Sequence, residues 1–426
     1  MKTVVQFICS LFISVFVHAQ DVATRLSTAV KNLEADSQLK NGMMSLYVVN
    51  QKSGEVVFSK NSTIGLPVAS SQKVITSAAS LELLGIDYRY KTELFYSGKI
   101  TDGVLNGNVY LTGYGDPTLG SWRYNNTREQ IVLNKWISGL KQAGIRQVNG
   151  SVAAIDKNWE TQTIPGGWIW DDIGNYYGAG VMALNWRENQ YDVSLKSGKT
   201  GSTVAVVSTT PVLYQVTLKS EVEAGKPGSG DNAYIYLPPY SATGFIRGTI
   251  PPGENAFTIS GAFPNPTRQL IHTITAELIK QGIPVTLQDA KVPGSSLAGA
   301  VNILTHRSPP LDSINYWFLK KSINLYGEAL VKTLGFEKKA QGATASGLTV
   351  IKDFWKSKGI ESTSINIIDG SGLSPQNHVA TEALVKVMQY ARTRPWFSSF
   401  YGALPEINGI KMKSGTIGGV KSFTGY

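Results

Sequence analysis

Partway along the chain, the residue pattern changes from mixed α/β to mainly strand-like, and helical patterns then return. The mixed pattern occurs before about residue 91 and the helical patterns after about residue 294, whereas residues 92–293 contain short strand-like runs, many glycines and turns. In this middle stretch, residues 193–207, 212–222 and 233–237 are typical of strands. Each kind of element has to bury its apolar face against a partner. We therefore predict a mixed α/β, multidomain fold in which one α/β domain is interrupted by a large β-rich insertion.

The same pattern predicts how the chain divides. A length of 426 residues is typical of roughly two or three domains. We assign the split α/β domain to residues 20–91 and 294–426, a first inserted domain to 92–190 and 259–293, and a second, mainly β, inserted domain to 191–258. Further helices are predicted at residues 268–281, 311–321, 325–334, 348–358 and 381–392, and strands at 45–49, 56–58 and, as a final pair, within 409–426.

Residues 1–19 resemble a cleavable export signal. Lys2 precedes an apolar run, and Val17-His18-Ala19 resembles a small-residue cleavage site. No later run of about 18 apolar residues follows, so we predict a periplasmic or extracellular protein with at most peripheral membrane contact. Cys9 lies inside the apolar run and is the only cysteine, which disfavours a lipoprotein anchor and leaves the mature chain without thiols or disulfides.

The formal net charge is +10, which suits contact with an acidic polymer or surface. A basic surface that simply aids solubility is an equally acceptable interpretation. No arginine-rich helix, zinc-ligand spacing or RNA-binding aromatic motif accompanies the charge. We therefore predict no nucleic-acid partner.

A serine and a lysine lie three residues apart at the start of a predicted buried helix over residues 70–84. Ser70 and Lys73 project from one face of such a helix, and a neutral lysine there can accept the serine proton. Burial and a nearby cation would lower the pKa of Lys73. Taken alone, such a pair is more often structural, and the same spacing recurs at Ser37 and Lys40. That second pair lies in a charged stretch typical of a solvated surface, so we select Ser70 and Lys73.

A Ser-Ile-Asn string occurs three times. Ser313 begins one copy inside an amphipathic helix, and Ser364 begins another just before a strand-like run. Ser322 and Asn324 instead lie at a junction between two predicted helices, where a hydroxyl and an amide can face a cleft. We select Ser322 and Asn324 as candidate catalytic residues.

A third motif, Lys413-Ser414-Gly415-Thr416, ends a strand-like run near the C-terminus. Lys199-Thr200-Gly201 and the neighbouring Lys196-Ser197-Gly198 are competing copies. Those copies lie in a Gly-, Ser- and Lys-rich stretch typical of a flexible hairpin tip, and they precede the second motif. We select Lys413, because a peptide can pair with a strand at that position.

In this order the motifs resemble those of the class C low-molecular-mass penicillin-binding proteins, the D-alanyl-D-alanine carboxypeptidase/endopeptidase family. The resemblance covers nearly the whole mature chain and includes a long insertion between the first two motifs. Its further stretches are Leu111-Thr112-Gly113-Tyr114-Gly115-Asp116-Pro117-Thr118, Trp168-Ile169-Trp170-Asp171-Asp172 and Asp369-Gly370-Ser371-Gly372-Leu373-Ser374. It implies a penicillin-binding, β-lactamase-like transpeptidase domain with a sheet flanked by helices, and a penicillin-sensitive enzyme that cleaves peptidoglycan peptides through an acyl-serine.

The resemblance also implies residue roles. Ser70 is the expected nucleophile, Lys73 its general base, and Ser322 the group that relays a proton to the leaving amine. The backbone N–H groups of Ser70 and Thr416 are expected to form an oxyanion hole. The remaining expected contacts with substrate come from Asn324 to the peptide amide, Lys413 through its positive potential, and Ser414, Gly415 and Thr416 around the terminal carboxylate.

Three aspartates, Asp116, Asp172 and Asp369, lie in the stretches that carry the resemblance. Asp172 matches an acid that, in the family, reaches toward the amino group of a diaminopimelate side chain, although a solvent-facing acid beside Asp171 fits the sequence equally well. Asp116 and Asp369 lie in predicted turns, where aspartate usually bonds local backbone, so neither receives a catalytic role.

Two departures from the family pattern stand out. Ser414 replaces the usual threonine but keeps the hydroxyl. The family continues well beyond the position of Tyr426 with further strands and a closing helix, which leaves open whether the sequence is a fragment and active as written.

Competing functions are a class A-like β-lactamase and a catalytically silent wall-binding relative. The first would need a Glu-x-x-Leu-Asn loop, and no such string occurs; the second has no need of both lysines and the hydroxyls. No cofactor is expected. No metal is expected either, because His272, His306 and His378 lack metal-ligand spacing. The predicted partners are peptidoglycan stem peptides as substrates and β-lactams as inhibitors.

Overall fold

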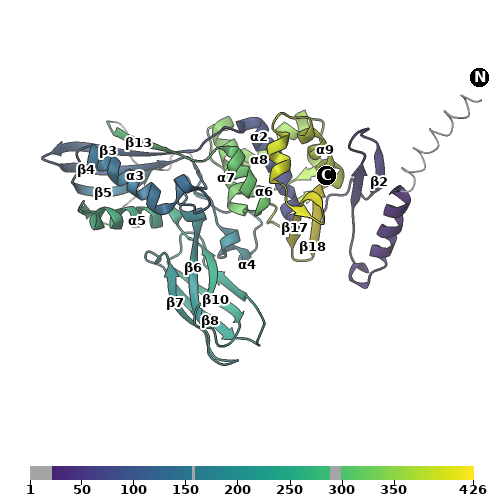
Figure 1. Ribbon diagram of the computed structural model, residues 1–426, viewed down its shortest axis with the longest axis horizontal. Helices are drawn as coiled ribbons and strands as arrows, with labels where there is room; N and C mark the ends of the chain where they lie inside the picture. Colours follow the sequence, from purple (N-terminus) through teal and green to yellow (C-terminus); the bar gives the residue numbers. More distant parts are fainter. Residues whose placement is uncertain (1–21, 156–158, 288–298) are drawn as a thin grey trace, which may run out of the picture.

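The computed structural model describes residues 22–155, 159–287 and 299–426. Figure 1 shows a helical body in the middle of the molecule, an α/β part on one side of it and a β-rich part that projects below. The predicted mixed α/β, multidomain fold is therefore confirmed. The predicted export signal at residues 1–19 lies outside the described residues. Within the parts of the chain that the structure describes, no helix combines the length and apolar character needed to cross a membrane.

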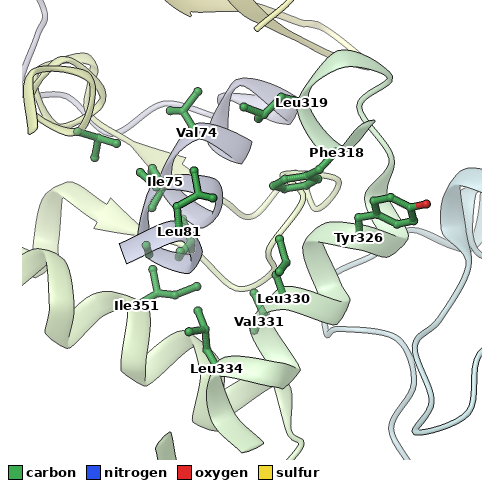
Figure 2. Close-up of a cluster of buried hydrophobic side chains, with 14 of the residues drawn as sticks. Val74, Ile75, Leu81, Phe318, Leu319, Tyr326, Leu330, Val331, Leu334 and Ile351 are labelled. Atoms are coloured by element: carbon green, nitrogen blue, oxygen red, sulfur yellow. The ribbon is translucent and has the colours of Figure 1, made fainter. Parts of the chain in front are cut away.

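The helical body is built around one buried helix, α2. Its residues 73–81 are all buried, and it ends at Gly85, whose φ of 87° suits a residue without a Cβ. The neighbouring helices α6, α7, α8 and α9 pack around it, and Figure 2 shows their shared apolar core, including Ile75, Phe318 and Leu330. The helices of the body are the 3₁₀ helix η2 (Ala69–Gln72), α2 (Lys73–Leu84), α6 (Leu311–Lys320), α7 (Asn324–Lys339), α8 (Thr344–Ser357), α9 (Thr381–Arg392) and α10 (Phe397–Ala403).

The strands of the body form small antiparallel sheets. These are β1 (Leu46–Val49) with β2 (Val56–Lys60), β14 (Ile365–Asn366) with β15 (His378–Val379), and β17 (Ile410–Ile417) between β16 (Glu406–Ile407) and β18 (Val420–Gly425). In the last of these, Lys413 pairs with Thr424 and Gly415 with Ser422. Both β17 and β18 pack against η2. The C-terminal sheet therefore lies directly beside the start of the buried helix.

The first inserted part is a five-stranded sheet packed against helices. Its strand order is β12-β5-β4-β3-β13, with β4 and β5 parallel. The elements are β3 (Lys91–Thr101), β4 (Val104–Gly113), α3 (Glu129–Gln142), β5 (Gln147–Ile155), α5 (Pro266–Lys280), β12 (Val285–Leu287) and β13 (Val301–Arg307). A second apolar core, which includes Trp136, Trp186 and Leu270, lies between the sheet and its helices.

The second inserted part contains two three-stranded sheets, in the orders β11-β6-β7 and β8-β10-β9. They enclose a third core that includes Val193, Ile235 and Ile246. The strands are β6 (Gln190–Lys196), β7 (Ala205–Thr210), β8 (Thr217–Ala224), β9 (Asn232–Tyr236), β10 (Thr243–Ile250) and β11 (Phe257–Ala262). A short helix, α4 (Trp170–Ile173), contacts β9 at the border with the body.

Three separate apolar cores support the division into three domains, which we retain as a proposal. The boundary at residues 293/294 lies outside the described residues. Strand β13, on the far side of that boundary, pairs antiparallel with β3. The chain therefore returns to the body along the edge of the inserted sheet.

Candidate active site

Ser70 and Lys73 lie where η2 passes into α2. Ala69, with φ of 45°, turns the chain into this 3₁₀ helix, and Ser70 remains half-buried while Lys73 is fully buried. Lys73 Nζ lies 2.8 Å from Ser70 Oγ. The two side chains predicted to share one helix face are therefore in hydrogen-bond contact. The competing Ser37 lies in an exposed 3₁₀ helix, η1 (Ser37–Leu39), in which no residue is buried.

Three oxygens surround Lys73 Nζ. Besides Ser70 Oγ, Asn324 Oδ1 and the Ser371 carbonyl oxygen each lie 2.7 Å from it. The latter two can only accept hydrogen bonds, whereas the serine hydroxyl can also donate. A neutral amine can therefore donate to Asn324 and Ser371 and turn its lone pair toward the Ser70 hydroxyl. Burial, together with the nearby charge of Lys413, lowers the pKa of Lys73 well below its ordinary value, against the opposing charges of Asp369 and Glu328.

Asn324 is oriented by a bond on its other side. Its Nδ2 donates to the Tyr177 carbonyl oxygen at 2.8 Å, which leaves Oδ1 for Lys73. Ser322 lies in the non-helical junction between α6 and α7, half-buried, with φ of 58°. Among the described residues its hydroxyl makes no hydrogen bond to Ser70 or Lys73. The structure thus brings Asn324 to the lysine and places Ser322 two residues before it.

The other two Ser-Ile-Asn copies lie elsewhere. In the copy on α6, Asn315 Oδ1 accepts a hydrogen bond from Ser77 inside the body. In the third copy, Ser364 lies in the exposed 3₁₀ helix η6 (Ser362–Ser364).

The third motif lies on β17, beside η2. Lys413 is 2% exposed, and burial lowers the pKa of its amine to about 8. Its Nζ donates to the Ser414 carbonyl oxygen at 2.7 Å. Ser414 is half-buried, and exposed Thr416 accepts a hydrogen bond from Lys421 Nζ at 3.0 Å. The competing Lys199-Thr200-Gly201 is exposed between β6 and β7, which belong to a different sheet in the second inserted part.

Gly415 brings β17 close to the backbone at the start of η2. A Cβ built at position 415 would lie 2.4 Å from the Val68 carbonyl oxygen and 2.8 Å from the Ser70 backbone nitrogen. Real Cβ atoms do not approach backbone atoms so closely. A glycine is therefore required for the strand to lie against the serine.

Asp172 lies in α4, at the border of the inserted parts. It is half-buried, and burial raises the pKa of its carboxyl, with a hydrogen bond from Tyr177 acting in the opposite direction. Tyr177 is the residue whose carbonyl oxygen orients Asn324. A short path of contacts therefore joins Asp172 to Lys73. Neighbouring Asp171 instead accepts a hydrogen bond from the Tyr236 hydroxyl at 2.8 Å.

Asp369 has a larger part in the site than the sequence predicted. The prediction that it and Asp116 bond local backbone is confirmed, since Asp116 accepts from Thr118, and Asp369 from Gly372 and Ser374. Asp369 is also fully buried and accepts three side-chain hydrogen bonds, two of them from distant parts of the chain. The donors are Gln72 Nε2 at 3.1 Å, Trp168 Nε1 at 3.0 Å and Asn377 Nδ2 at 2.9 Å.

These bonds fix the loop that carries the third oxygen around Lys73. Ser371, which supplies that carbonyl oxygen, lies two residues after Asp369. The neighbouring Gly370 N–H donates to the buried Glu328 carboxylate, whose pKa is raised by burial. The Asp-Gly-Ser-Gly string was the available signal, because glycines beside a buried aspartate allow the backbone to pack closely around it.

The inserted part is attached to this loop. Trp168 donates to Asp369, and Ser374 Oγ donates to the Gly167 carbonyl oxygen at 2.9 Å. A Cβ on Gly167, whose φ is 79°, would lie 2.7 Å from Ser374 Oγ. The insertion therefore holds the wall of the site in place.

No metal site accompanies these residues. Across residues 22–155, 159–287 and 299–426, no group of three or more His, Cys, Asp or Glu side chains is placed to hold an ion. The chemistry that the described geometry offers is proton transfer between a hydroxyl and a buried amine.

The family model of the D-Ala-D-Ala carboxypeptidase 3 (S13) family matches residues 26–426. The chain belongs to this family. Among curated relatives, it is 25% identical to a D-alanyl-D-alanine carboxypeptidase of Actinomadura sp. strain R39, over 95% of this chain and 78% of the relative. It is 24% identical to the D-alanyl-D-alanine carboxypeptidase DacB of Haemophilus influenzae, over 80% of this chain and 69% of the relative.

Among solved structures, penicillin-binding protein 4 from Haemophilus influenzae has a similar fold. The TM-score is 0.74 at 22% identity, covering 89% of this chain and 85% of that chain. A second structure of that protein, complexed with a β-lactam, gives a TM-score of 0.67. The predicted family resemblance is therefore confirmed.

Proposed function

We propose that this chain is a serine-type D-Ala-D-Ala peptidase that acts on peptidoglycan peptides through a Ser70 acyl-enzyme. The observation that carries the proposal is the contact between Ser70 Oγ and the fully buried Lys73 Nζ, 2.8 Å apart. A desolvated amine of lowered pKa is suited to accept a hydroxyl proton near neutral pH. Membership of the S13 family supports the same activity.

The reaction begins when Lys73 takes the Ser70 proton and Oγ attacks the carbonyl carbon of the penultimate D-Ala. The negative oxygen of the tetrahedral intermediate is held by the backbone N–H groups of Ser70 and Thr416. The proximity of Gly415 to the Ser70 nitrogen supports this assignment, because it brings β17 alongside that N–H. Collapse of the intermediate breaks the peptide bond, and the leaving amine receives its proton from Lys73 through Ser322. Water then hydrolyses the acyl-serine.

Three further residues bind and orient the substrate. Asn324, held by Tyr177 and Lys73, donates to a peptide carbonyl oxygen once substrate competes for its amide. Lys413 supplies positive charge beneath the terminal carboxylate, which the Ser414 and Thr416 hydroxyls bind. Lys413 is nearly inaccessible to solvent, so its field acts in a medium that screens it weakly.

Asp172 sets a preference for the stem-peptide diamino acid. Its carboxylate lies in α4, and its partner Tyr177 contacts Asn324 through the backbone. A free amino group on the substrate side chain pairs with this carboxylate. Asp172→Ala should therefore weaken cleavage of diaminopimelate-containing peptides more than cleavage of simple D-Ala-D-Ala peptides, and equal loss on both would refute this role.

The protein acts outside the cytoplasmic membrane, where its polymer substrate lies, and β-lactams are its inhibitors. The signal-like residues 1–19 and the β-lactam complex of the similar penicillin-binding protein 4 support these two statements. Family membership favours a peptidase over the class A-like β-lactamase. The contact between Ser70 and Lys73 argues against a silent wall-binding relative.

A fluorescent penicillin tests the proposal. The wild-type chain and Ser37→Ala should be labelled covalently, whereas Ser70→Ala should not, because only Ser70 contacts a buried lysine. Labelling that survives Ser70→Ala would sink the assignment. Digestion of purified pentapeptides and of cross-linked muropeptides then separates carboxypeptidase from endopeptidase activity, since both share the acyl-enzyme.

A further inference from the structure

The connection between β4 and α3 carries an exposed aromatic side chain against the helical body. Trp122 is 46% exposed, although the backbone around it is well fixed. Ser121 N–H donates to the Thr118 carbonyl oxygen, and Thr127 Oγ1 donates to that of Ser121. The Trp122 indole is therefore held in place while nearly half of its surface remains open to solvent.

Arg123 joins this indole to a second one on the body. Its guanidinium lies 5.4 Å from the Trp122 ring and 5.3 Å from the Trp317 ring of α6. Both oxygens of Glu188 accept hydrogen bonds from Arg123 Nε, at 2.9 and 3.1 Å. Glu188 is itself fully buried and also accepts from the Tyr326 hydroxyl at 2.8 Å. Hydrogen bonds to the buried Glu188 therefore hold the Arg123 guanidinium between the Trp122 and Trp317 rings, and this network reaches Tyr326 in the first turn of α7.

Two hollows, each of about 540 Å³, are lined by the two indoles, one by Trp122 and the other by Trp317. The first contains Trp122, and its polar lining includes Arg128, Gln130 and Asp192. The second contains Trp317 and Tyr316, which is 41% exposed, and its polar lining includes Ser398 and Ser399 of α10. Each hollow thus pairs an aromatic face with short or charged hydrogen-bonding groups.

Trp122, Tyr316 and Trp317 together form an aromatic track. We propose that this track binds the saccharide chain of the polymer whose peptides are cleaved at Ser70. Aromatic faces stack on the C–H faces of pyranose rings, and the surrounding hydroxyl, amide and charged groups bind sugar hydroxyls and N-acetyl groups. The inference rests on the proposed function, because it takes its ligand from the same substrate.

The track lies within reach of the catalytic residues. Trp317 and Asn324 are seven positions apart along the chain. Because the first three of these steps lie within helix α6, the two Cα atoms are at most about 19 Å apart. An extended five-residue stem peptide spans about 17 Å. A sugar in the track can therefore carry the peptide whose end lies at Ser70. A glycan held there would raise the effective concentration of its stem peptide at the site.

The test measures binding of peptide-free glycan strands, from which an amidase has removed the stem peptides, to the full chain by titration calorimetry. Wild type should bind, and Trp122→Ala/Tyr316→Ala should bind at least about tenfold more weakly. Trp122→Phe/Tyr316→Phe should retain most of the affinity, because it keeps both aromatic faces. Tyr240→Ala is the matched control, since Tyr240 is 54% exposed and lines neither hollow.

Penicillin labelling of Ser70 should be unchanged in these three variants and in Ser398→Glu. Loss of glycan binding with normal labelling would concern the aromatic track alone, whereas loss of labelling in wild type would contradict the proposed function. If the double alanine variant does not fold, Ser398→Glu fills the second hollow from the exposed face of α10 and should weaken binding by the same order. The proposal is overturned if wild type does not bind the peptide-free glycan. It is also overturned if Ser398→Glu and the alanine variant bind like wild type, or if Tyr240→Ala loses as much affinity as they do.

Discussion

Gly415 and Ser70 are in direct backbone contact, although 345 positions separate them in the chain. A Cβ at position 415 would lie 2.8 Å from the Ser70 nitrogen. Ser422, which pairs with Gly415 across β17 and β18, donates through its hydroxyl to the Val68 carbonyl oxygen, and the same oxygen lies 2.9 Å from Ser71 Oγ. The C-terminal sheet therefore sets the position of the 3₁₀ helix that carries the proposed nucleophile.

Gly415→Ala should slow penicillin acylation by about 100-fold, because the added methyl group meets backbone atoms that cannot rotate away, and a shift of about 1 Å is enough for such a loss. The rate of fluorescent-penicillin labelling measures the effect. Gly418→Ala is the control, since a Cβ there meets no atom within 4 Å. Equal rates for both variants would show that the contact does not position Ser70.

Lys413→Met should stabilise the protein at neutral pH. Burial lowers the pKa of Lys413 to about 8, whereas the unfolded chain has the ordinary value of 10.5. Below pH 8 the folded state carries a buried cation, and this cost is relieved as pH rises from 8 toward 10.5. We expect about 2 kcal/mol of added stability at pH 7 that disappears by about pH 10.5. Thermal unfolding across this pH range tests it, and a gain that persists at pH 10.5 would contradict it.

The same substitution should move the pH profile of acylation. The charge of Lys413 contributes to the lowered pKa of Lys73, so its removal raises the Lys73 pKa. Fewer Lys73 amines are then neutral at a given pH. The acidic limb of the acylation rate should shift to higher pH in Lys413→Met, in addition to any loss of rate. If the acidic limb did not shift, the charge of Lys413 would have no effect on the pKa of Lys73, which would contradict this prediction.

Asp369→Asn should loosen the loop that carries the Ser371 carbonyl oxygen. Five groups donate to this carboxylate, from Gln72, Trp168, Gly372, Ser374 and Asn377. An amide NH₂ would face donors, leaving buried N–H groups without an acceptor at a cost of about 2–3 kcal/mol. Acylation should slow, and protease sensitivity between the body and residues 159–190 should increase. Exposed Asp353 provides the control Asp353→Asn, which should behave as wild type.

Glu160→Ala should destabilise the protein more than Lys332→Met. The fully buried Lys332 Nζ lies 3.1 Å from Glu160 Oε1 and donates to the Gln162 carbonyl oxygen at 2.6 Å. Removing Glu160 leaves a buried cation and also deprives the Thr344 N–H of its acceptor, at about 3 kcal/mol. Lys332→Met removes both the charge and its desolvation cost. Chemical denaturation should rank the two variants in this order.

Local patterns accounted for much of the fold. The predicted helix at 381–392 coincides with α9 (Thr381–Arg392), and the final pair of strands within 409–426 is found as β17 and β18. Gly85 and Gly282, each with a positive φ, directly follow the predicted helices at 70–84 and 268–281. Helix α3 was not predicted, since the surrounding glycines and strand-like runs obscured its apolar face.

Contacts between distant segments were harder to predict. The Ser70–Lys73 pair follows from helix spacing alone, whereas Asp369 and Trp168, 201 positions apart, share no periodicity. An aspartate in a turn usually bonds its own backbone, and Asp369 does so. Nothing local indicates that its remaining lone pairs accept hydrogen bonds from Trp168 of the insertion and from Gln72 of η2. Such bonds depend on tertiary packing, which fixes them only once the whole body is assembled.

The split of the body also affects how the protein is made. Helix α2 is buried along most of its length by α6, α7, α8 and α9, and the first of these begins at Leu311. At about 5–20 residues per second, the ribosome needs roughly 10–45 seconds after Leu84 to reach that point. During this interval an apolar helix has no permanent partner, while the inserted cores can already form. In a nascent chain of this design, the apolar surface of α2 therefore stays uncovered until its partner helices have been synthesised.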